Sequence, residues 1–307
     1  MTKTIPILGT AMWGWTTEKA VCFTLLDEFY ARGFRRVDAA TNYPINKQVG
    51  DFRKAENILL EWIKTNGVND LEVMMKVGSV NNLRTPEVIL NKSFLLLSLD
   101  DYKAKFGQNL HNLTIHWDNR KAEAEILDTF DFLGIAHKEG LRLGLSGIRY
   151  PEIYARVNEQ FAFDFDIQIK HNLLHSDYDR YKDFHGKRRF LAYGMNAGGI
   201  KLEQQFYTPS ASLKARGWDG HSFEIVPKLK ELLKHYNKDN ARPFTRFYEC
   251  GLLFAMQHPE ISGVLIGTSR LEQLQKTLDL MEEISSHDFS ILYDSLVELS
   301  RAKHYAK

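Results

Sequence analysis

Four side chains capable of acid–base chemistry stand at or just after short apolar runs in the first half of the chain: Asp38, Tyr43, Lys76 and His116. A free phenol, with a pKa of about 10, is a poor proton donor near neutral pH, and an ammonium beside it favours the phenolate. Lys76 would supply that charge, and Asp38 would keep the ammonium protonated and oriented. The set predicts that Tyr43 protonates an oxygen on which negative charge develops, with His116 as a second hydrogen-bond donor to that oxygen.

These four residues can act together only if separate elements bring them to one place. Short β-branched runs alternate with longer amphipathic segments, at a spacing of roughly 25 to 40 residues. The predicted strands are 4–8, 34–37, 72–76, 112–115, 141–145, 165–169, 190–192 and 263–266. The predicted helices are 17–32, 54–66, 86–99, 121–138, 151–160, 177–184, 223–236, 243–257, 270–284 and 289–302. Thr85 before Pro86 predicts the start of one of them.

The alternation of strands and helices predicts parallel pairing through right-handed crossovers, and eight such units close into a (β/α)8 TIM barrel. An open doubly wound sheet has a similar pattern, but no G-x-G-x-x-G motif follows an early strand, and the glycines at 194–199 come late with another spacing. In a barrel the strand ends that carry Asp38, Lys76 and His116 meet at one mouth. No linker divides the chain, so we expect residues 1–307 to form a single α/β domain.

The composition narrows the classes of partner. The formal net charge is +1, with acidic and basic residues mixed along the chain, which argues against nucleic acid and anionic membranes as partners. Cys22 and Cys250 are too few for a disulfide framework, and no stretch approaches the ~20 apolar residues of a membrane span. The apolar run 5–15 is interrupted by proline and glycine and is followed by no cleavage site. We therefore predict a cytoplasmic protein that binds a small molecule.

The four acid–base residues resemble, in order and context, the Asp, Tyr, Lys and His tetrad of the aldo-keto reductases. Segments 8–15, 116–117 and 266–274 are also similar to that family, and the likeness extends from residue 5 to about 284. The resemblance implies reduction of an aldehyde, ketone or sugar carbonyl, or the reverse oxidation, by hydride transfer from NAD(P)H. Tyr43 would be the general acid/base.

The resemblance also implies a set of cofactor-binding residues. Tyr193 would stack on the nicotinamide, and Ser146 and Gln168 would hold its carboxamide. Further contacts are implied in the segment that contains Gly267, Thr268, Ser269, Arg270 and Gln273. Ser269 followed by Glu272 predicts a capping box, and the N-terminus of the following helix suits a phosphate. Because Arg270 adds a cation there, we expect NADP(H) rather than NAD(H).

Two residues depart from the family pattern. Gly147 stands where many members have Asn after the serine of strand five, and Thr277 stands where an Asn is usual in the adenine-binding segment. These departures predict an unusual cofactor affinity or nucleotide preference. The long irregular stretch 200–222 carries Lys214 and Arg216, which would add cations if this loop closes on the cofactor.

Aromatic residues suggest the substrate side of the site. Trp13, Trp117 and Trp218 would form an aromatic wall for a polar carbonyl or a sugar. The alternative is that these tryptophans pack in the barrel and contact no substrate.

Two other classes of function compete with a reductase. The first is a metal-dependent hydrolase that uses His171, His175 and His185. Two histidines four residues apart share a metal when they lie on one helix face, and His171 falls at a strand end, so we expect no metal site. The second is a non-enzymatic nucleotide-binding barrel that acts as a redox sensor or partner-binding subunit.

Overall fold

Eight parallel strands close on themselves in the computed structural model, which describes residues 4–186, 189–203, 213, 217–218 and 223–302. The barrel strands are β1 (Ile5–Gly9), β2 (Arg36–Ala40), β3 (Glu72–Val77), β4 (Leu110–His116), β5 (Arg142–Ser146), β6 (Phe165–Asn172), β8 (Arg189–Tyr193) and β9 (Ile261–Ile266). Each strand pairs with the next in this order, and β9 pairs with β1 to close the barrel. The prediction of a (β/α)8 barrel is confirmed.

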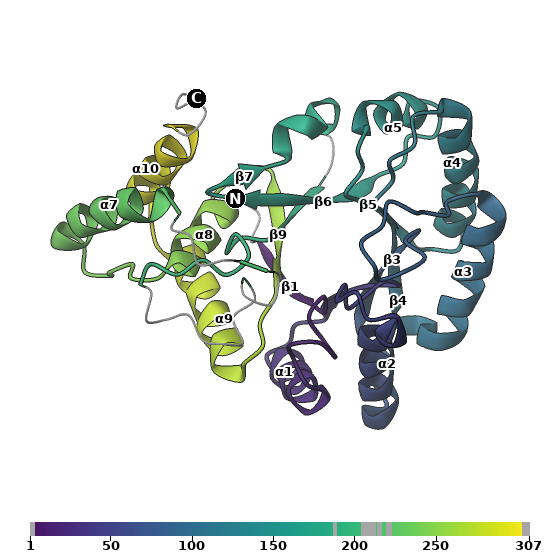
Figure 1. Cartoon of the computed structure of the whole chain (residues 1–307), viewed down its shortest axis with the longest axis horizontal. Coiled ribbons are helices and arrows are strands. Elements are labelled where there is room, and N and C mark those ends of the chain that lie inside the picture. Colours follow the sequence, from purple (N-terminus) through teal and green to yellow (C-terminus); the bar gives the residue numbers. More distant parts are fainter. Residues whose placement is uncertain (1–3, 187–188, 204–212, 214–216, 219–222, 303–307) are drawn as a thin grey trace.

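Helices cover the outside of the barrel (Figure 1). In the described residues the α-helices are α1 (Lys19–Ala31), α2 (Lys54–Asn66), α3 (Lys92–Phe106), α4 (Glu123–Lys138), α5 (Pro151–Asn158), α7 (Ile225–Asp239), α8 (Phe247–Met256), α9 (Leu271–Ser286) and α10 (Ser290–Arg301). The remaining elements are the 3₁₀ helices η1 (Val49–Asp51), η2 (Gly107–Asn109) and η3 (Tyr178–Phe184), and β7 (His175–Ser176), which forms an antiparallel hairpin with β6. Helices α2 to α5 lie on one side of the barrel, and α7 to α10 lie on the other (Figure 1).

Two predicted helices differ from the observed elements. The segment 177–184 forms the 3₁₀ helix η3, and the helix predicted at 86–99 begins after Asn91, whose side-chain oxygen accepts the N–H of Phe94 at 2.9 Å. The predicted cap at Thr85 is wrong, because its hydroxyl donates to Glu87 at 2.8 Å in a loop that precedes the helix. Asn91 satisfies a free N–H of the first turn in its place.

The core has two layers. Ile7, Met74, Leu191 and Leu265 form a small cluster of buried side chains from β1, β3, β8 and β9. Because β3 pairs with neither β8 nor β9, these side chains meet inside the barrel. A much larger apolar cluster fills the space between the strands and the helices. Burial of each large apolar side chain contributes about 1.5–3 kcal/mol, so this packing fixes the strand ends on which the polar groups stand.

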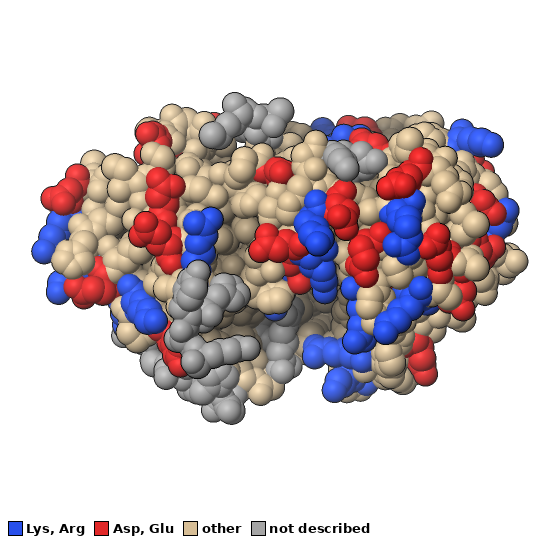
Figure 2. Space-filling model, turned by 90° about the horizontal axis from the view of Figure 1, so that it is seen from above, with Lys and Arg blue, Asp and Glu red and all other residues tan. Residues whose placement is uncertain are grey.

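The surface shows no separation of charge on the face seen in Figure 2, where acidic and basic side chains are intermixed. None of the helices in the described part of the chain is long and apolar enough to cross a membrane. Most of the predicted loop 200–222 lies outside the described residues, and Lys214 and Arg216 fall in that part.

Candidate active site

Three of the four predicted acid–base residues lie toward the carboxyl ends of adjacent strands. Asp38 is in β2, Lys76 is in β3, and His116 is the last residue of β4. Tyr43 lies in the loop that follows β2. All four side chains are at least nine-tenths buried, with Tyr43 the most accessible at 9%. The strand order therefore brings these residues to one mouth of the barrel, as the sequence predicts.

The carboxylate of Asp38 is held from two sides. Lys76 Nζ donates to Asp38 Oδ2, and Gln168 Nε2 donates to Asp38 Oδ1 at 2.6 Å. Because β2 and β6 do not pair, the second hydrogen bond crosses the barrel interior. Burial lowers the pKa of the Lys76 ammonium, while the charge and hydrogen bond of Asp38 act to raise it. Removal of either partner would leave the other as an unpaired buried charge.

Tyr43 contacts both Lys76 and His116. Lys76 Nζ lies 4.7 Å from the centroid of the Tyr43 ring, and the Tyr43 and His116 rings meet edge to face at 6.2 Å between centroids. Burial, and after it the charge of Lys76, lower the pKa of His116 well below its ordinary value, so the imidazole is neutral at pH 7. Within the described residues, the buried Nδ1 of His116 has no hydrogen-bond partner. The phenol thus lies between a cation and a neutral ring.

The structure explains why residue 147 is a glycine. Gly147 follows β5 with a φ of +69°, and a Cβ built on it would lie 2.5 Å from Cδ1 of Trp117. The Trp117 indole therefore occupies the space that a side chain at 147 would need. Trp117 also packs on His116, with 4.7 Å between the ring centroids. The departure at Gly147 accommodates an aromatic side chain beside the acid–base group.

The residues predicted to hold the nicotinamide stand next to the acid–base group. Ser146, the last residue of β5, is in register with His116 on β4 and with Gln168 on β6. Ser146 and Gln168 are buried, and Gln168 uses its amide nitrogen to bind Asp38. Tyr193 is the last residue of β8, and burial raises the pKa of its phenol, which stays protonated at neutral pH.

Three cations gather at the starts of the last two barrel helices, and sequence reasoning identified one of them. Arg246 directly precedes α8, Arg270 directly precedes α9, and Lys201 lies in the segment after β8. Burial lowers the pKa of Lys201, and the charges of Arg246 and Arg270 lower it further, so both arginines lie within electrostatic range of Lys201. Like charges beside two helix N-termini suit an anion. Lys201 and Arg246 belong to no motif; Lys201 follows a barrel strand, which was the available signal for it, whereas Arg246 follows helix α7 and had none.

The capping box predicted at Ser269 is wrong. Helix α9 begins one residue later, after Arg270, and no side chain caps it. Thr268 organises this turn instead, because its hydroxyl accepts the N–H of Arg270 at 3.4 Å and lies 3.1 Å from Gln273 Oε1. Gly267 lies between β9 and this turn. The expected helix N-terminus is present, with a different local arrangement.

The three tryptophans predicted at the substrate side differ in their surroundings. Trp13 is completely buried in the hydrophobic core. Trp117 is half-buried and packs on His116, whereas Trp218 is half-buried and stacks on Phe223 with 5.9 Å between ring centroids. Of the three, Trp117 directly contacts the acid–base group.

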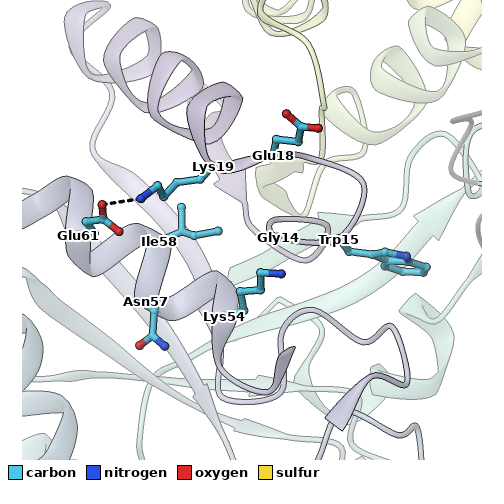
Figure 3. A pocket seen from close by; sticks show the side chains of 8 residues that line it. All are labelled: Gly14, Trp15, Glu18, Lys19, Lys54, Asn57, Ile58 and Glu61. Atoms are coloured by element: carbon cyan, nitrogen blue, oxygen red, sulfur yellow. Dashed lines mark hydrogen bonds and ion pairs between the residues drawn. The ribbon is translucent and has the colours of Figure 1, made fainter. Parts of the chain in front are cut away.

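A separate pocket of about 420 Å³ lies between α2 and the chain that leads from β1 into α1 (Figure 3). It is lined by Gly14, Trp15, Glu18, Lys19, Lys54, Asn57, Ile58 and Glu61. Lys19 pairs with Glu61 at 2.8 Å, and the stem of Lys54 lies against Gly14. None of the acid–base residues lines this pocket, so it is distinct from the candidate active site.

The histidines considered for a metal site make separate contacts. His171 Nδ1 bonds to Ser176, His175 Nε2 bonds to Asp177, and His185 Nε2 donates to a backbone carbonyl. Among the described residues, no group of three or more His, Cys, Asp or Glu side chains is arranged to hold a metal ion.

The closed α/β barrel thus carries a buried Lys–Asp pair, a tyrosine and a neutral histidine at the carboxyl ends of its strands, the side on which barrel enzymes hold their active sites. The model of the Aldo/keto reductase family matches residues 7–296, and the chain belongs to this family. The family comprises carbonyl oxidoreductases that use nicotinamide cofactors.

Among solved structures, the chain is similar to aldo-keto reductase AKR11C1 from Bacillus halodurans in its holo form, with a TM-score of 0.71 and 16% sequence identity. The match covers 97% of this chain and 95% of that chain. At this identity the likeness shows the fold. No curated protein matches the sequence.

Proposed function

We propose that the chain is an NADP(H)-dependent oxidoreductase that reduces an aldehyde, ketone or sugar carbonyl, or oxidises the alcohol, with Tyr43 as general acid/base. One observation carries the proposal: Lys76 Nζ lies 4.7 Å from the Tyr43 ring centroid while its charge is paired with Asp38. An ammonium fixed in this way favours the phenolate, which makes the phenol a usable proton donor near neutral pH.

Each of the four residues has a separate task in this proposal. Tyr43 gives its proton to the carbonyl oxygen as negative charge develops there, and takes a proton back in the oxidation direction. Lys76 stabilises the phenolate that remains, and Asp38 orients the ammonium. Neutral His116 donates a hydrogen bond to the same oxygen and sets the angle of the carbonyl. A bound reduced nicotinamide supplies the hydride.

The cations Lys201, Arg246 and Arg270 support a dinucleotide, and NADP(H) more than NAD(H). NADP carries one phosphate more than NAD, and a third cation beside two helix N-termini suits that additional charge. Ser146, Gln168 and Tyr193 would hold the nicotinamide. The segment Gly267, Thr268, Ser269, Arg270 and Gln273 would hold the adenosine and phosphate end.

The surroundings of His116 support a substrate with an apolar face beside its carbonyl. Trp117 packs on His116 and is half-buried, so it can contact such a face. We include Trp218 in the same proposed wall, whereas Trp13, which is completely buried in the core, has no surface to offer a substrate. A cytoplasmic location and a single domain over residues 1–307 are further parts of this proposal, and the two free, buried cysteines are in keeping with a reducing compartment.

The direct test is an assay of the purified chain with NADPH or NADH and a panel of aldehydes, ketones and sugars. We expect carbonyl-dependent oxidation of the reduced nucleotide, faster with NADPH than with NADH. Quenching of tryptophan fluorescence by the nucleotide without turnover of any carbonyl would contradict the proposal and favour a nucleotide-binding sensor.

A further inference from the structure

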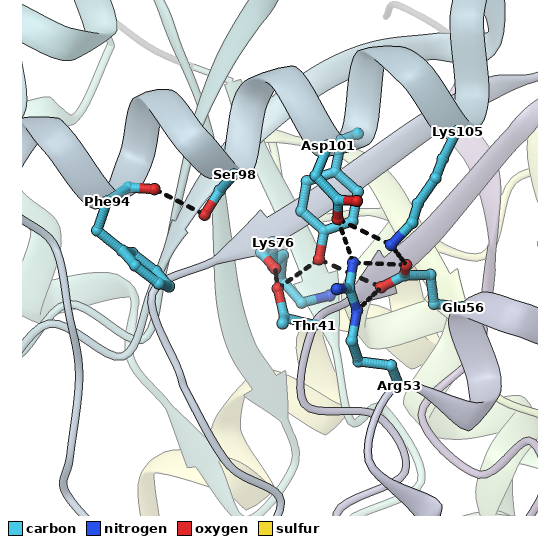
Figure 4. Close-up of polar contacts among 9 residues, drawn as sticks. Thr41, Arg53, Glu56, Lys76, Phe94, Ser98, Asp101 and Lys105 are labelled. Carbon is cyan, nitrogen blue, oxygen red and sulfur yellow. Dashed lines mark hydrogen bonds and ion pairs between the residues drawn. The ribbon is translucent and has the colours of Figure 1, made fainter.

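A partly buried polar chain joins the end of β3 to an ion cluster between α2 and α3 (Figure 4). The carbonyl oxygen of Lys76 accepts two hydrogen bonds from Thr41, one from the backbone N–H and one from the hydroxyl, each at 3.1 Å. Thr41 Oγ1 lies 2.8 Å from the hydroxyl of Tyr102 in α3. Because Thr41 stands between Asp38 and Tyr43 in sequence, this contact ties the segment that carries both to the strand that carries Lys76.

Hydrogen counting limits how this chain is bonded. Burial raises the pKa of Tyr102, so its phenol keeps one proton to donate. Tyr102 donates this proton to Glu56 Oε2 at 3.2 Å, because a carboxylate can only accept. The Thr41 hydroxyl is therefore the donor at the β3 end of the chain, with the Lys76 carbonyl at 3.1 Å and the Tyr102 hydroxyl at 2.8 Å as its acceptors.

The far end of the chain is anchored by ion pairs. Glu56 is completely buried and accepts from Arg53 at 2.7 and 2.9 Å and from Lys105 at 3.1 Å. Asp101 in α3 binds the same two cations at 2.6 and 2.8 Å. Arg53 has a left-handed backbone with a φ of +64°, a conformation that costs energy in a residue other than glycine and persists where its surroundings hold it. The cluster thus fixes the Tyr102 hydroxyl from two helices.

We propose that Thr41 and Tyr102 are positioning residues, which hold the Lys76 ammonium at a set distance from Asp38 and Tyr43. This inference rests on the proposed function of Tyr43 as general acid/base. The attraction between an ammonium and a phenolate falls with distance, so a shift of the β3 end relative to β2 would make the phenol a weaker acid.

The test compares Thr41→Val, which removes the hydroxyl, with Thr41→Ser, which keeps it, and with Tyr102→Phe. Ser262→Ala is the matched control, because the Ser262 hydroxyl donates to the carbonyl of Phe190 at 3.2 Å and so joins two strands near the opposite end of the barrel. Three quantities are measured for each variant: thermal unfolding, kcat and KM against pH, and ionisation of the Tyr43 phenol by ultraviolet difference titration against the same variant carrying Tyr43→Phe.

We expect Thr41→Val to raise the alkaline limb of the kcat profile and the pKa of the Tyr43 phenol by about one pH unit each. This shift corresponds to about a tenfold loss of acidity. The KM for nucleotide should stay unchanged. Tyr102→Phe should shift both in the same direction by less. Thr41→Ser should keep native values, and Ser262→Ala should lose thermal stability without either shift.

Two outcomes separate this inference from the proposed function. If Thr41→Val and Tyr102→Phe unfold at lower temperature but keep the native Tyr43 ionisation, the inference is overturned; if Thr41→Val does not fold, Tyr102→Phe decides it alone. If the native chain reduces no carbonyl, the proposed function fails, and the titration still decides the inference because it needs no turnover.

Discussion

The two ends of the barrel both bury charge, but they differ in how completely that charge is paired. At the amino ends of the strands, Asp166 accepts hydrogen bonds from Arg142, Arg189 and Asn112 at distances of 2.7–3.2 Å. At the carboxyl ends, Asp38 is held by Lys76 and Gln168. Asp166 therefore keeps other charged partners if one is lost, whereas Lys76 is the one cation that binds Asp38.

Buried polar atoms without partners also distinguish the two ends. Among the described residues, both amide atoms of Asn42, the hydroxyl of Ser79 and Nδ1 of His116 lack a partner, and all three residues follow or end strands at the carboxyl side. At the amino end, Nε2 of His111 also lacks a hydrogen-bond partner, and it lies 3.8 Å from the carboxylate of Glu72. An unsatisfied buried group costs about 1–3 kcal/mol. The comparison indicates that the amino end stabilises the barrel, while the carboxyl end keeps polar atoms available for a ligand.

The largest expected effect is at the carboxyl end. Tyr43→Phe should lower turnover by a factor on the order of 10²–10⁴, because it removes the proposed proton donor and little else. Nucleotide affinity, measured by quenching of tryptophan fluorescence, should stay native and is the control for an intact site. A variant with near-native turnover would remove Tyr43 from the proposed role.

Lys76→Met should lower turnover on the order of 10²-fold or more, because the phenol loses the charge that favours its ionisation. It should also reduce the free energy of unfolding by about 3–5 kcal/mol, since Asp38 becomes an unpaired buried charge. Turnover and urea unfolding are measured on the same preparation. If the variant is less stable but its folded molecules turn over at the native rate, the ion pair of Lys76 with Asp38 stabilises the fold and does not assist Tyr43.

Arg270→Ala should weaken NADPH about tenfold to a hundredfold and change NADH little, because a charge-assisted hydrogen bond contributes roughly 1.5–3 kcal/mol. Lys276→Ala is the matched control, since Lys276 is an exposed cation on the same helix that pairs with Glu272. Titration of both nucleotides decides the outcome. Equal losses for NADPH and NADH, or no loss, would mean that Arg270 does not read the additional phosphate.

Asp166→Asn tests the amino end. Removal of this carboxylate should lower the free energy of unfolding by about 1–3 kcal/mol, because Arg142 and Arg189 lose a partner but remain partly exposed to water. Turnover per folded molecule should stay native. A loss of turnover as large as that of Lys76→Met would abolish the proposed division between the two ends.

A final expected effect is a dependence of stability on pH. Burial, and after it the charge of His258, lower the pKa of His171 from its ordinary value of 6.5 to about 3. The unfolded chain therefore binds a proton here before the folded chain does, so this contribution to stability is present above pH 6.5 and is lost as the pH falls toward 3, by at most about 1.4 kcal/mol per pH unit. Urea unfolding at several pH values should give a flatter dependence for His171→Asn; an unchanged slope would contradict the assignment.

The sequence determined the architecture because hydrophobic periodicity is local. Alternating strand and helix patterns predicted all eight barrel strands, and their polar ends predicted that Asp38, Lys76 and His116 meet at one mouth. Errors arose at helix starts, where more than one nearby residue has a type that can cap a helix. Thr85 and Ser269 both have the residue type of a helix cap, but the helices begin at other residues.

The tertiary structure decided the features that depend on residues far apart in the chain. Gln168 binds Asp38 across 130 residues, and Tyr102 reaches Thr41 across 61. Lys201, Arg246 and Arg270 stand in separate connections, and only the fold brings the two arginines within electrostatic range of Lys201. Gly147 is required because the Trp117 indole fills its side-chain space. A sequence pattern specifies which face of an element is buried, whereas these contacts depend on the closure of the barrel, which sets the distances between residues on different elements.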